Sequence, residues 1–360
     1  MTRRARVVAI VNQKGGVGKT TTSVNLSASL AAQKKKVLLI DMDPQGNACS
    51  GLGVFAAPNE KTLYHVLLGQ AGCDEVVRTT DVPGLFLTPA NTQLIGAEIE
   101  LVSELARETR LKRAIQKVVD QYDVILLDCP PSLGLLTVNA LTAADGVLVP
   151  LQCEYYALEG LSHLLKTIEL IKGSLNERLE LDGILLTMFD ARNNLAHQVV
   201  EEVRQHLPGK VCETIIPRNV RLSEAPSHGK PGILYDIGSR GVQAYIALAE
   251  ELSQRWGLDP KKAAPAASAT APAAATAPAA TAPVATAPAT APAATAPAAT
   301  APAAAPSASA LAPASAPASA SVPAARAARA PAPAQAAANA PAPSEPEAPA
   351  PAARRSSPSA

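Results

Sequence analysis

Lys14-Gly15-Gly16-Val17-Gly18-Lys19-Thr20 is the stretch of sequence that decides the fold. An apolar, β-branched run from Val7 to Val11 precedes it, and a helical pattern from Lys19 to Gln33 begins at its last two residues. Short apolar runs of this kind are typical of buried parallel strands. A strand that passes through a glycine-rich loop into a helix is the first half of a β-α unit. The start of the chain therefore predicts an α/β fold.

The same alternation continues for about 260 residues. Six further apolar runs, which end in or beside Gly, Pro, Asp or Asn, are predicted strands: Lys36 to Asp41, Leu85 to Pro89, Val124 to Asp128, Gly146 to Gln152, Gly183 to Met188 and Val211 to Pro217. Helical patterns lie between or after them, among them Ile99 to Asp120, Leu158 to Lys172, Leu195 to His206 and Gly241 to Trp256. Repeated β-α order predicts a doubly wound, mostly parallel sheet.

The composition divides the chain into two parts. Gly257 and Pro260 follow the last helical pattern, as is typical of a helix end, so we expect one folded domain over residues 1–260. Residues 261–360 are almost entirely Ala, Pro, Ser and Thr, with Thr-Ala-Pro repeated, and a Pro every few residues prevents a continuous helix. We expect this tail to be disordered and partly polyproline-like.

The charge and the cysteines exclude several classes of protein. The tail carries +4, which leaves −3 for residues 1–260, so any affinity for nucleic acid must come from a local patch. The five cysteines form no C-x-x-C pair, which argues against a zinc site and a disulfide framework and favours reduced thiols in the cytoplasm. The basic start of the chain is followed by only a short apolar run, so we expect neither an export signal nor a membrane span.

The glycine-rich loop has the chemistry of a phosphate-binding loop, or P-loop. Successive backbone N–H groups at Gly15, Gly16, Val17 and Gly18 can surround phosphate oxygens, and the N-terminus of the following helix adds a favourable field. Lys19 is placed to reach the β- and γ-phosphates, the Thr20 hydroxyl to bind Mg²⁺, and Thr21 to close the loop near the α-phosphate. The sequence therefore predicts an ATP and Mg²⁺ site.

Two aspartates have candidate roles in that site: Asp43 lies just beyond the end of one predicted strand, and Asp128 lies at the end of another. Asp43 can orient the attacking water, and Asp128 suits a water-mediated contact with Mg²⁺. Without the P-loop, an aspartate at either position would more often be interpreted as a residue that simply ends a strand. The P-loop makes the functional interpretation the better one for both.

The loop departs from the usual G-x-x-x-x-G-K-[ST] pattern, because Gln13 stands where the first Gly is expected and Lys14 begins the loop. It resembles the deviant Walker A motif of the ParA/MinD group of P-loop ATPases. The similarity extends through Val-Leu-Leu-Ile-Asp41-Met-Asp43-Pro-Gln-Gly-Asn47 and Val-Ile-Leu-Leu-Asp128-Cys-Pro-Pro131. The resemblance implies that Lys14 reaches across an ATP-bridged homodimer to the partner's nucleotide, where it acts like an arginine finger. The alternative is a solvated loop lysine.

Within the group, the chain resembles the chromosomal ParA (Soj) branch over nearly all of Val7 to Trp256. The runs that carry this resemblance are Leu186 to Asn193 and Ile215 to Pro231. It implies that Pro217 and Asn219 lie beside the adenine, and that Arg192 and Arg221 bind DNA without sequence specificity. The alternative for either arginine is a surface ion pair.

The implied function is an ATPase that dimerises with ATP, binds the nucleoid, and partitions a chromosome or plasmid with a ParB-type centromere-binding partner. The runner-up is a MinD-like, membrane-associated regulator of the position of division or of an organelle. Such a protein should end in a basic amphipathic helix, and this chain ends in an Ala/Pro tail. A related tyrosine kinase should carry a C-terminal Tyr cluster, and a nitrogenase-type reductase needs differently spaced cysteines. We therefore expect no membrane binding, and a location in the cytoplasm on the nucleoid.

Overall fold

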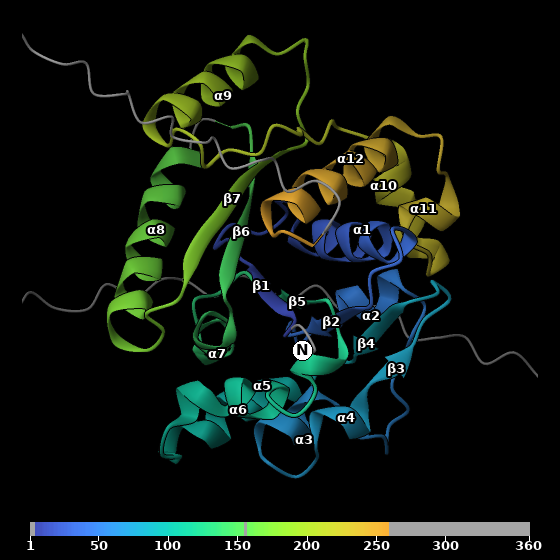
Figure 1. Ribbon diagram of the computed structural model, residues 1–360, viewed down its shortest axis with the longest axis vertical. Coiled ribbons are helices and arrows are strands. Elements are labelled where there is room, and N and C mark those ends of the chain that lie inside the picture. The colour runs from blue at the N-terminus through green and yellow to red at the C-terminus, as the bar shows by residue number, and fades with distance from the viewer. Residues whose placement is uncertain (1–3, 155–156, 259–360) are drawn as a thin grey trace, which may run out of the picture. The chain divides into compact units, whose positions relative to one another are not determined.

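The computed structural model describes residues 4–154 and 157–258 (Figure 1). Within this range seven strands form one sheet in the order β3-β4-β2-β5-β1-β6-β7, and every pair is parallel except β3 with β4. The predicted α/β fold with a doubly wound, mostly parallel sheet is confirmed. The predicted domain boundary at residue 260 and the predicted disordered tail lie outside the described residues.

The strands are β1 (Arg6–Ile10), β2 (Val37–Asp41), β3 (Arg78–Thr79), β4 (Leu85–Thr88), β5 (Val124–Asp128), β6 (Gly146–Gln152) and β7 (Glu180–Thr187). The α-helices are α1 (Lys19–Ala32), α2 (Asn47–Gly51), α3 (Leu63–Leu67), α4 (Cys73–Val76), α5 (Leu94–Glu100), α6 (Arg110–Ile115), α7 (Leu135–Ala143), α8 (Ala157–Ser174), α9 (Asn194–His206), α10 (Val220–Glu224), α11 (Gly232–Tyr235) and α12 (Arg240–Arg255). Short 3-10 helices are η1 (Leu101–Ser103), η2 (Arg107–Thr109), η3 (Val119–Gln121) and η4 (Ala225–His228).

The central strands are buried on both faces, which explains their continuous apolar sequences. In β1, Val7 and Ala9 face one hydrophobic cluster while Val8 and Ile10 face the other. Successive side chains of a strand point to opposite faces, so both faces of a covered parallel strand must be apolar. Each fully buried Val or Leu contributes roughly 1.5–3 kcal/mol to stability.

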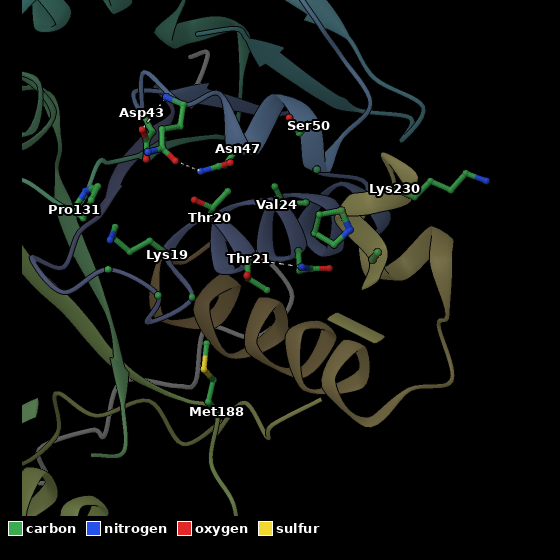
Figure 2. Close-up of a pocket in the computed structure, with 18 residues that line it drawn as sticks. Lys19, Thr20, Thr21, Val24, Asp43, Asn47, Ser50, Pro131, Met188 and Lys230 are labelled. Carbon is green, nitrogen blue, oxygen red and sulfur yellow. Dashed lines mark hydrogen bonds between the residues drawn. The ribbon is translucent and has the colours of Figure 1, made fainter. Parts of the chain in front are cut away.

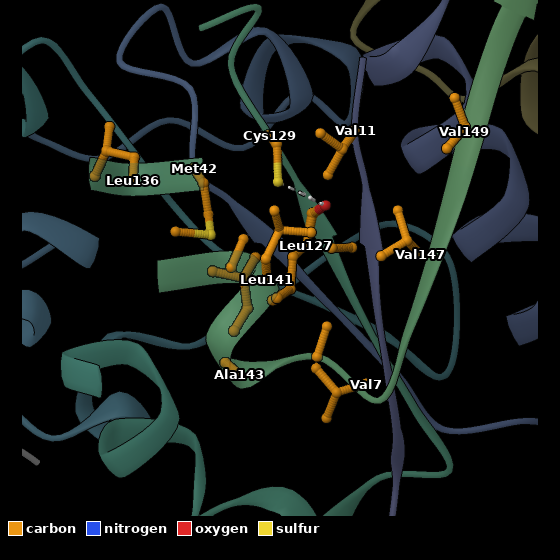
Figure 3. Close-up of a cluster of buried hydrophobic side chains, with 14 of the residues drawn as sticks. Val7, Val11, Met42, Leu127, Cys129, Leu136, Leu141, Ala143, Val147 and Val149 are labelled. Atoms are coloured by element: carbon orange, nitrogen blue, oxygen red, sulfur yellow. Dashed lines mark hydrogen bonds between the residues drawn. The ribbon is translucent and has the colours of Figure 1, made fainter. Parts of the chain in front are cut away.

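Helices cover both faces of the sheet. The side chains of α1 and α12 pack on one face, and those of α7 and α8 pack on the other (Figure 1). Figure 3 shows part of the second cluster, where Leu136 and Leu141 of α7 approach Leu127 of β5 and Met42. The loops at the carboxyl ends of β1, β2 and β5 contribute Gly15, Asp43 and Pro131 to one cavity, and ligands of open α/β sheets bind at this edge.

The predicted strand from Val211 to Pro217 is wrong. The segment forms no strand, and its pairing is limited to isolated bridges from Val211 to Ile184 of β7 and from Pro217 to Phe189, just beyond β7. Between them, the Glu251 carboxylate of α12 accepts hydrogen bonds from the backbone N–H groups of Glu213 and Thr214, each 2.9 Å long. These two amides are directed to a side chain, so they cannot continue the ladder.

The predicted single helix from Ile99 to Asp120 is also wrong. The region is divided among α5, η1, η2, α6 and η3, and Ala106 has a φ of 53°. A non-glycine residue in the left-handed region ends a helix. The short antiparallel strand β3 was not predicted, because two residues carry no readable periodicity.

All five cysteines are free and buried. In the described part of the chain, no helix is long and apolar enough to cross a membrane.

Candidate nucleotide site

The glycine-rich loop has the backbone conformation that a phosphate cradle needs. Gly16 and Gly18 have φ values of 75° and 89°, which side chains disfavour, and Gly18 is the N-cap of α1. No atom of the described residues lies within 4 Å of where a side chain on Gly15 or Gly16 would begin. The loop is therefore open at the positions where a phosphate would approach the backbone.

Neighbouring strands hold the loop in place. The buried Asn12 side chain donates to the Pro150 carbonyl at 2.7 Å and accepts from the Lys14 N–H at 2.9 Å. The buried Thr187 hydroxyl, at the end of β7, donates to the Val17 carbonyl at 2.9 Å. The loop conformation therefore depends on β6 and β7 as well as on its own glycines.

The two lysines of the loop have different surroundings. Lys19 is buried, and its Nζ donates to the Lys14 carbonyl at 3.2 Å. Burial lowers the pKa of Lys19, whereas the charges of Asp128 and Asp43 raise it. Lys14 is nearly half exposed at the rim, where its ammonium pairs with Glu154.

Three aspartates lie close together at the carboxyl ends of β2 and β5. Asp41 accepts hydrogen bonds from the N–H groups of Asp43 and Cys49, each 3.1 Å long. Asp43 accepts from the N–H of Gln45 at 3.0 Å and lines the central cavity. Burial raises the pKa of Asp41, and the Asp43 carboxylate adds to the increase. Asp43 is thus an acidic residue of the cavity wall, with Asp41 and Asp128 buried behind it and Lys19 as the nearby cation.

Asp128 is completely buried and only partly satisfied. Its Oδ1 lies 2.7 Å from the Ser23 hydroxyl, while its Oδ2 has no hydrogen-bond partner within the described ranges. Burial and the charge of Asp41 raise the pKa of Asp128. A buried carboxylate oxygen without a partner is costly unless a cation or water satisfies it. The geometry therefore fits the predicted contact with a hydrated Mg²⁺.

The described residues contain no group of three or more His, Cys, Asp or Glu side chains that could hold a metal ion by themselves. This does not conflict with Mg²⁺ at Thr20 and Asp128. Mg²⁺ in nucleotide sites keeps several waters and takes phosphate oxygens as ligands, so it needs few protein groups.

A cavity of about 470 Å³ lies between the glycine-rich loop and the loop that contains Asp43. Figure 2 shows Lys19, Thr20 and Asp43 around one end of it, and Lys230 at the other. The residues that line it are Gly15, Gly16, Gly18, Lys19, Thr20, Thr21, Val24, Asn25, Asp43, Gln45, Asn47, Ser50, Gly51, Pro131, Met188, Ala225, Pro226 and Lys230. Small-molecule sites commonly have this size.

Pro217 and Asn219 do not line this cavity. The Asn219 side chain caps α10 and accepts from the Leu222 N–H at 3.2 Å, and Pro217 pairs with Phe189. Met188, which precedes Phe189, does line the cavity, and it has a φ of 51°. The role of Pro217 and Asn219 beside the adenine stays a prediction.

Both candidate DNA-binding arginines are exposed and ion-paired within the chain. Arg192 bonds both oxygens of Asp190, at 2.9 and 2.7 Å, and lowers the pKa of that carboxyl. Arg221 pairs with Glu224 at 2.9 Å and with Asp236 at 3.3 Å. The alternative interpretation as surface ion pairs is thus observed, although exposed pairs of this kind are weak enough to exchange for phosphate.

Sequence reasoning missed several side chains that support the site. Ser23 lies four residues after Lys19, so it shares that face of α1, and this spacing could have revealed it. Thr187, Pro131, Met188 and Glu154 come from distant parts of the chain. Their contribution depends on the sheet order, which the sequence pattern does not specify.

Comparisons with known proteins agree with this geometry. A protein-family model described as an AAA domain matches residues 5–181. The chain is 59% identical over 248 residues to the sporulation initiation inhibitor protein Soj of Bacillus subtilis, covering 69% of this chain and 98% of Soj. It is 58% identical over 250 residues to the chromosome partitioning protein ParA of Myxococcus xanthus, covering 69% of this chain and 88% of that ParA.

A solved structure is similar as well. Cobyrinic acid a,c-diamide synthase from Mycobacterium smegmatis, with bound ATP analog and magnesium, is 39% identical, with a TM-score of 0.62. The match covers 70% of this chain and 96% of that chain.

Proposed function

The chain belongs to the ParA/Soj family of chromosome-partitioning ATPases, and from that premise we propose that it is a DNA-binding dimer switched by ATP. With ATP and Mg²⁺ bound, two copies associate and bind DNA without sequence specificity. Hydrolysis, stimulated by a ParB-type centromere-binding protein, separates the copies and releases the DNA. Repeated cycles of this kind move a chromosome or plasmid.

The observation that carries this proposal is the difference between the two loop lysines. Lys19 is buried beside the anionic residues of its own site, whereas Lys14 is at the rim and paired with Glu154. A cation at the rim is available to the phosphates of a facing molecule, and a cation beside the γ-phosphate stabilises the charge that develops during hydrolysis. This supports a role for Lys14 in a second copy's site.

The proposed cofactors are ATP and Mg²⁺, which would be held by the loop amides of 15–18, by Lys19, by the Thr20 and Thr21 hydroxyls, and by Asp128 through water. The partnerless Oδ2 of Asp128 supports the metal contact. When bound, Mg²⁺ neutralises charge on the phosphates. Pro217 and Asn219 are proposed to lie beside the adenine, and the pairing of Pro217 with Phe189, next to Met188 in the cavity wall, supports this.

We assign Asp43 the role of orienting the attacking water. It lines the cavity and follows the strand that ends at Asp41. Its Oδ1 already accepts the Gln45 N–H, which fixes the carboxylate's orientation. A positioned carboxylate can contribute on the order of 10² to 10⁴ in rate through proton transfer to or from the nucleophile.

Arg192 and Arg221 are proposed to contact DNA phosphates from the dimer surface, which would place the protein on the nucleoid in the cytoplasm. Both are exposed, and their ion pairs are with exposed or half-exposed carboxylates. Phosphate contacts add affinity without sequence information.

The test is co-sedimentation of the protein with unrelated DNA fragments in the presence of ATP, ADP or no nucleotide. We expect binding with ATP only, together with ATP-dependent dimerisation in sedimentation velocity. Anionic lipid vesicles are the comparison surface. Binding to vesicles but not to DNA would favour the MinD-like alternative and would refute the partitioning function.

A further inference from the structure

Four large apolar side chains are exposed along one stretch of the chain. They are Ile95, Ile99, Val102 and Leu105, with exposed fractions of 53%, 71%, 62% and 90%. Ile95, Ile99 and Val102 are four and three residues apart, which puts them on one side of α5 and η1. We call these four residues the α5 stripe. Contiguous exposed apolar residues mark interaction surfaces more often than scattered ones do.

The opposite side of the same helix is anchored in the core. Leu94, Ala97 and Leu101 are buried in the larger hydrophobic cluster. The exposure of the α5 stripe therefore does not come from a loosely attached helix. Its apolar side chains point outward from a segment that the core already holds.

The α5 stripe lies at the nucleotide edge of the sheet. Helix α5 follows the carboxyl end of β4, and the Ala90 carbonyl in that connection closely approaches Gly46, in the loop after Asp43. On the other side, Glu98 of α5 accepts from the Leu136 N–H at 3.5 Å, beside the loop that contains Pro131. The connection that leads into α5 thus lies against the loop after Asp43, and Glu98 of α5 lies against the end of the loop after β5.

The direction of the stripe follows from Glu98. Glu98 is three residues after Ile95 and four before Val102, so these three residues are neighbours on one helix face. Glu98 lies against Gly134 and Leu136, where the loop after β5 ends and α7 begins, so its helix neighbours Ile95 and Val102 lie near the end of that loop. Pro131 of the same loop is exposed and lines the nucleotide cavity.

Charged residues alternate with the stripe in the sequence and follow it. The acidic ones are Glu98, Glu100 and Glu104, and the basic ones are Arg107, Arg110, Lys112, Arg113 and Lys117. An apolar centre with a charged rim is the usual composition of a protein–protein interface. A membrane-facing helix would instead carry mainly basic residues beside its apolar face, whereas the charged residues between Ile95 and Leu105 are Glu98, Glu100 and Glu104.

We propose that the α5 stripe packs against a second copy of this chain in the ATP-bound dimer. This rests on the proposed function, because that function brings a second copy to the nucleotide edge, where Lys14 and the stripe both lie. Contacts around the phosphates alone would be small, whereas a stable interface buries about 800 Å² on each partner. The stripe supplies the apolar area that the nucleotide rim lacks.

The experiment compares Ile99→Lys and Ile95→Ser/Ile99→Lys with Leu170→Lys. Leu170 is 72% exposed, close to the 71% of Ile99, but it lies near the end of α8, at the amino end of the sheet. Dimerisation is measured by sedimentation velocity with Mg²⁺ and a non-hydrolysable ATP analogue, and nucleotide affinity is measured at concentrations where the protein is monomeric. All three side chains are more than half exposed, so the substitutions remove little buried contact.

We expect Ile99→Lys to raise the dimer dissociation constant at least about tenfold, and the double variant to raise it further. Leu170→Lys should dimerise like the unaltered protein, and nucleotide affinity should change less than about twofold in every variant. Normal dimerisation of the double variant would overturn the inference. Normal dimerisation with lost stimulation by a ParB-type protein would overturn it as well, and would assign the stripe to that partner. If the unaltered protein never dimerised, the proposed function itself would fail, which is a distinct result.

Discussion

Lys14 Nζ forms an ion pair with the carboxylate of Glu154, 140 residues later in the chain. Glu154 follows β6, and β6 lies beside β1 in the sheet, so sheet order brings the two residues together. Both side chains are nearly half exposed, and such a pair contributes at most about 1 kcal/mol. The pair holds Lys14 at the rim, yet it is weak enough to exchange for a phosphate of a second copy.

Glu154→Gln should therefore strengthen ATP-dependent dimerisation, by up to about fivefold, because the competing partner of Lys14 loses its charge. Lys14→Ala should keep ATP binding and lose both dimerisation and hydrolysis. Equilibrium sedimentation with and without ATP measures the dimerisation of both variants. Nucleotide titration checks that Lys14→Ala still binds ATP. Weaker dimerisation of the Glu154 variant would mean that this carboxylate helps to hold the dimer.

Lys19→Ala should reduce ATP affinity by at least about a hundredfold, since the buried cation beside the phosphates is lost from an otherwise anionic pocket. The melting temperature without nucleotide should change little, because within the described residues the Lys19 ammonium makes one hydrogen bond, 3.2 Å long, to the Lys14 carbonyl. Lys34→Ala, at the other end of α1, is the control. Unchanged ATP affinity of Lys19→Ala in calorimetric titration would refute the phosphate-site assignment.

Asp43→Ala should reduce ATP hydrolysis on the order of a hundredfold or more while ATP binding and dimerisation persist. The loop amides, Lys14 and Lys19 remain, so the ATP-bound dimer should accumulate on DNA. Phosphate release and DNA co-sedimentation measure the two effects. DNA binding reduced to the level seen with ADP would show that Asp43, which also bonds the Gln45 N–H, is needed for the loop structure instead.

Asp128→Asn should stabilise the nucleotide-free protein at neutral pH and weaken Mg²⁺-dependent ATP binding. Burial raises the folded-state pKa of Asp128 above its unfolded value of about 3.9. The folded state therefore retains the proton longer, and this contribution to stability is lost as the pH rises through the folded-state pKa. The difference in melting temperature between Asp128→Asn and the unaltered protein should thus grow from pH 5 to pH 8.

The opposite pH trend in that difference would show that Asp128 is ionised and stabilised in the free protein. Titration of ATP with and without Mg²⁺ separates the metal contact from the fold. Asp128→Asn should affect only the affinity that depends on Mg²⁺.

The double variant Arg192→Glu/Arg221→Glu should no longer co-sediment with DNA, while ATP-dependent crosslinking of its dimer persists. A neutral substitution at either position should lower the dependence of log affinity on log salt by roughly one unit, equally for unrelated DNA sequences. Arg178→Glu, an exposed residue in the turn before β7, is the matched control. Normal DNA binding by the double variant would move the contact elsewhere, with Arg204, Lys210 and Lys230 the next candidates.

Local sequence was sufficient for the elements that depend on local chemistry. The apolar strand, the glycines and Lys19 predicted the loop and the start of α1, because left-handed backbone and helix initiation involve residues close in the chain. Continuous apolar runs predicted β2 and β5, because strands covered on both faces need no polar side chain. Asp43 and Asp128 could be predicted to lie at the same edge of the sheet because parallel strands end at one edge.

Contacts between distant segments were decided only by the tertiary structure. The segment from Val211 to Pro217 has a strand-like sequence, yet the Glu251 carboxylate on α12 takes the amides of Glu213 and Thr214. The Thr187 hydroxyl on the Val17 carbonyl, and Glu154 on Lys14, depend on β7 and β6 being next to β1 in the sheet order. Periodicity reports which face of an element is apolar, but it does not report which side chain will reach across from another strand, because that depends on how the layers pack.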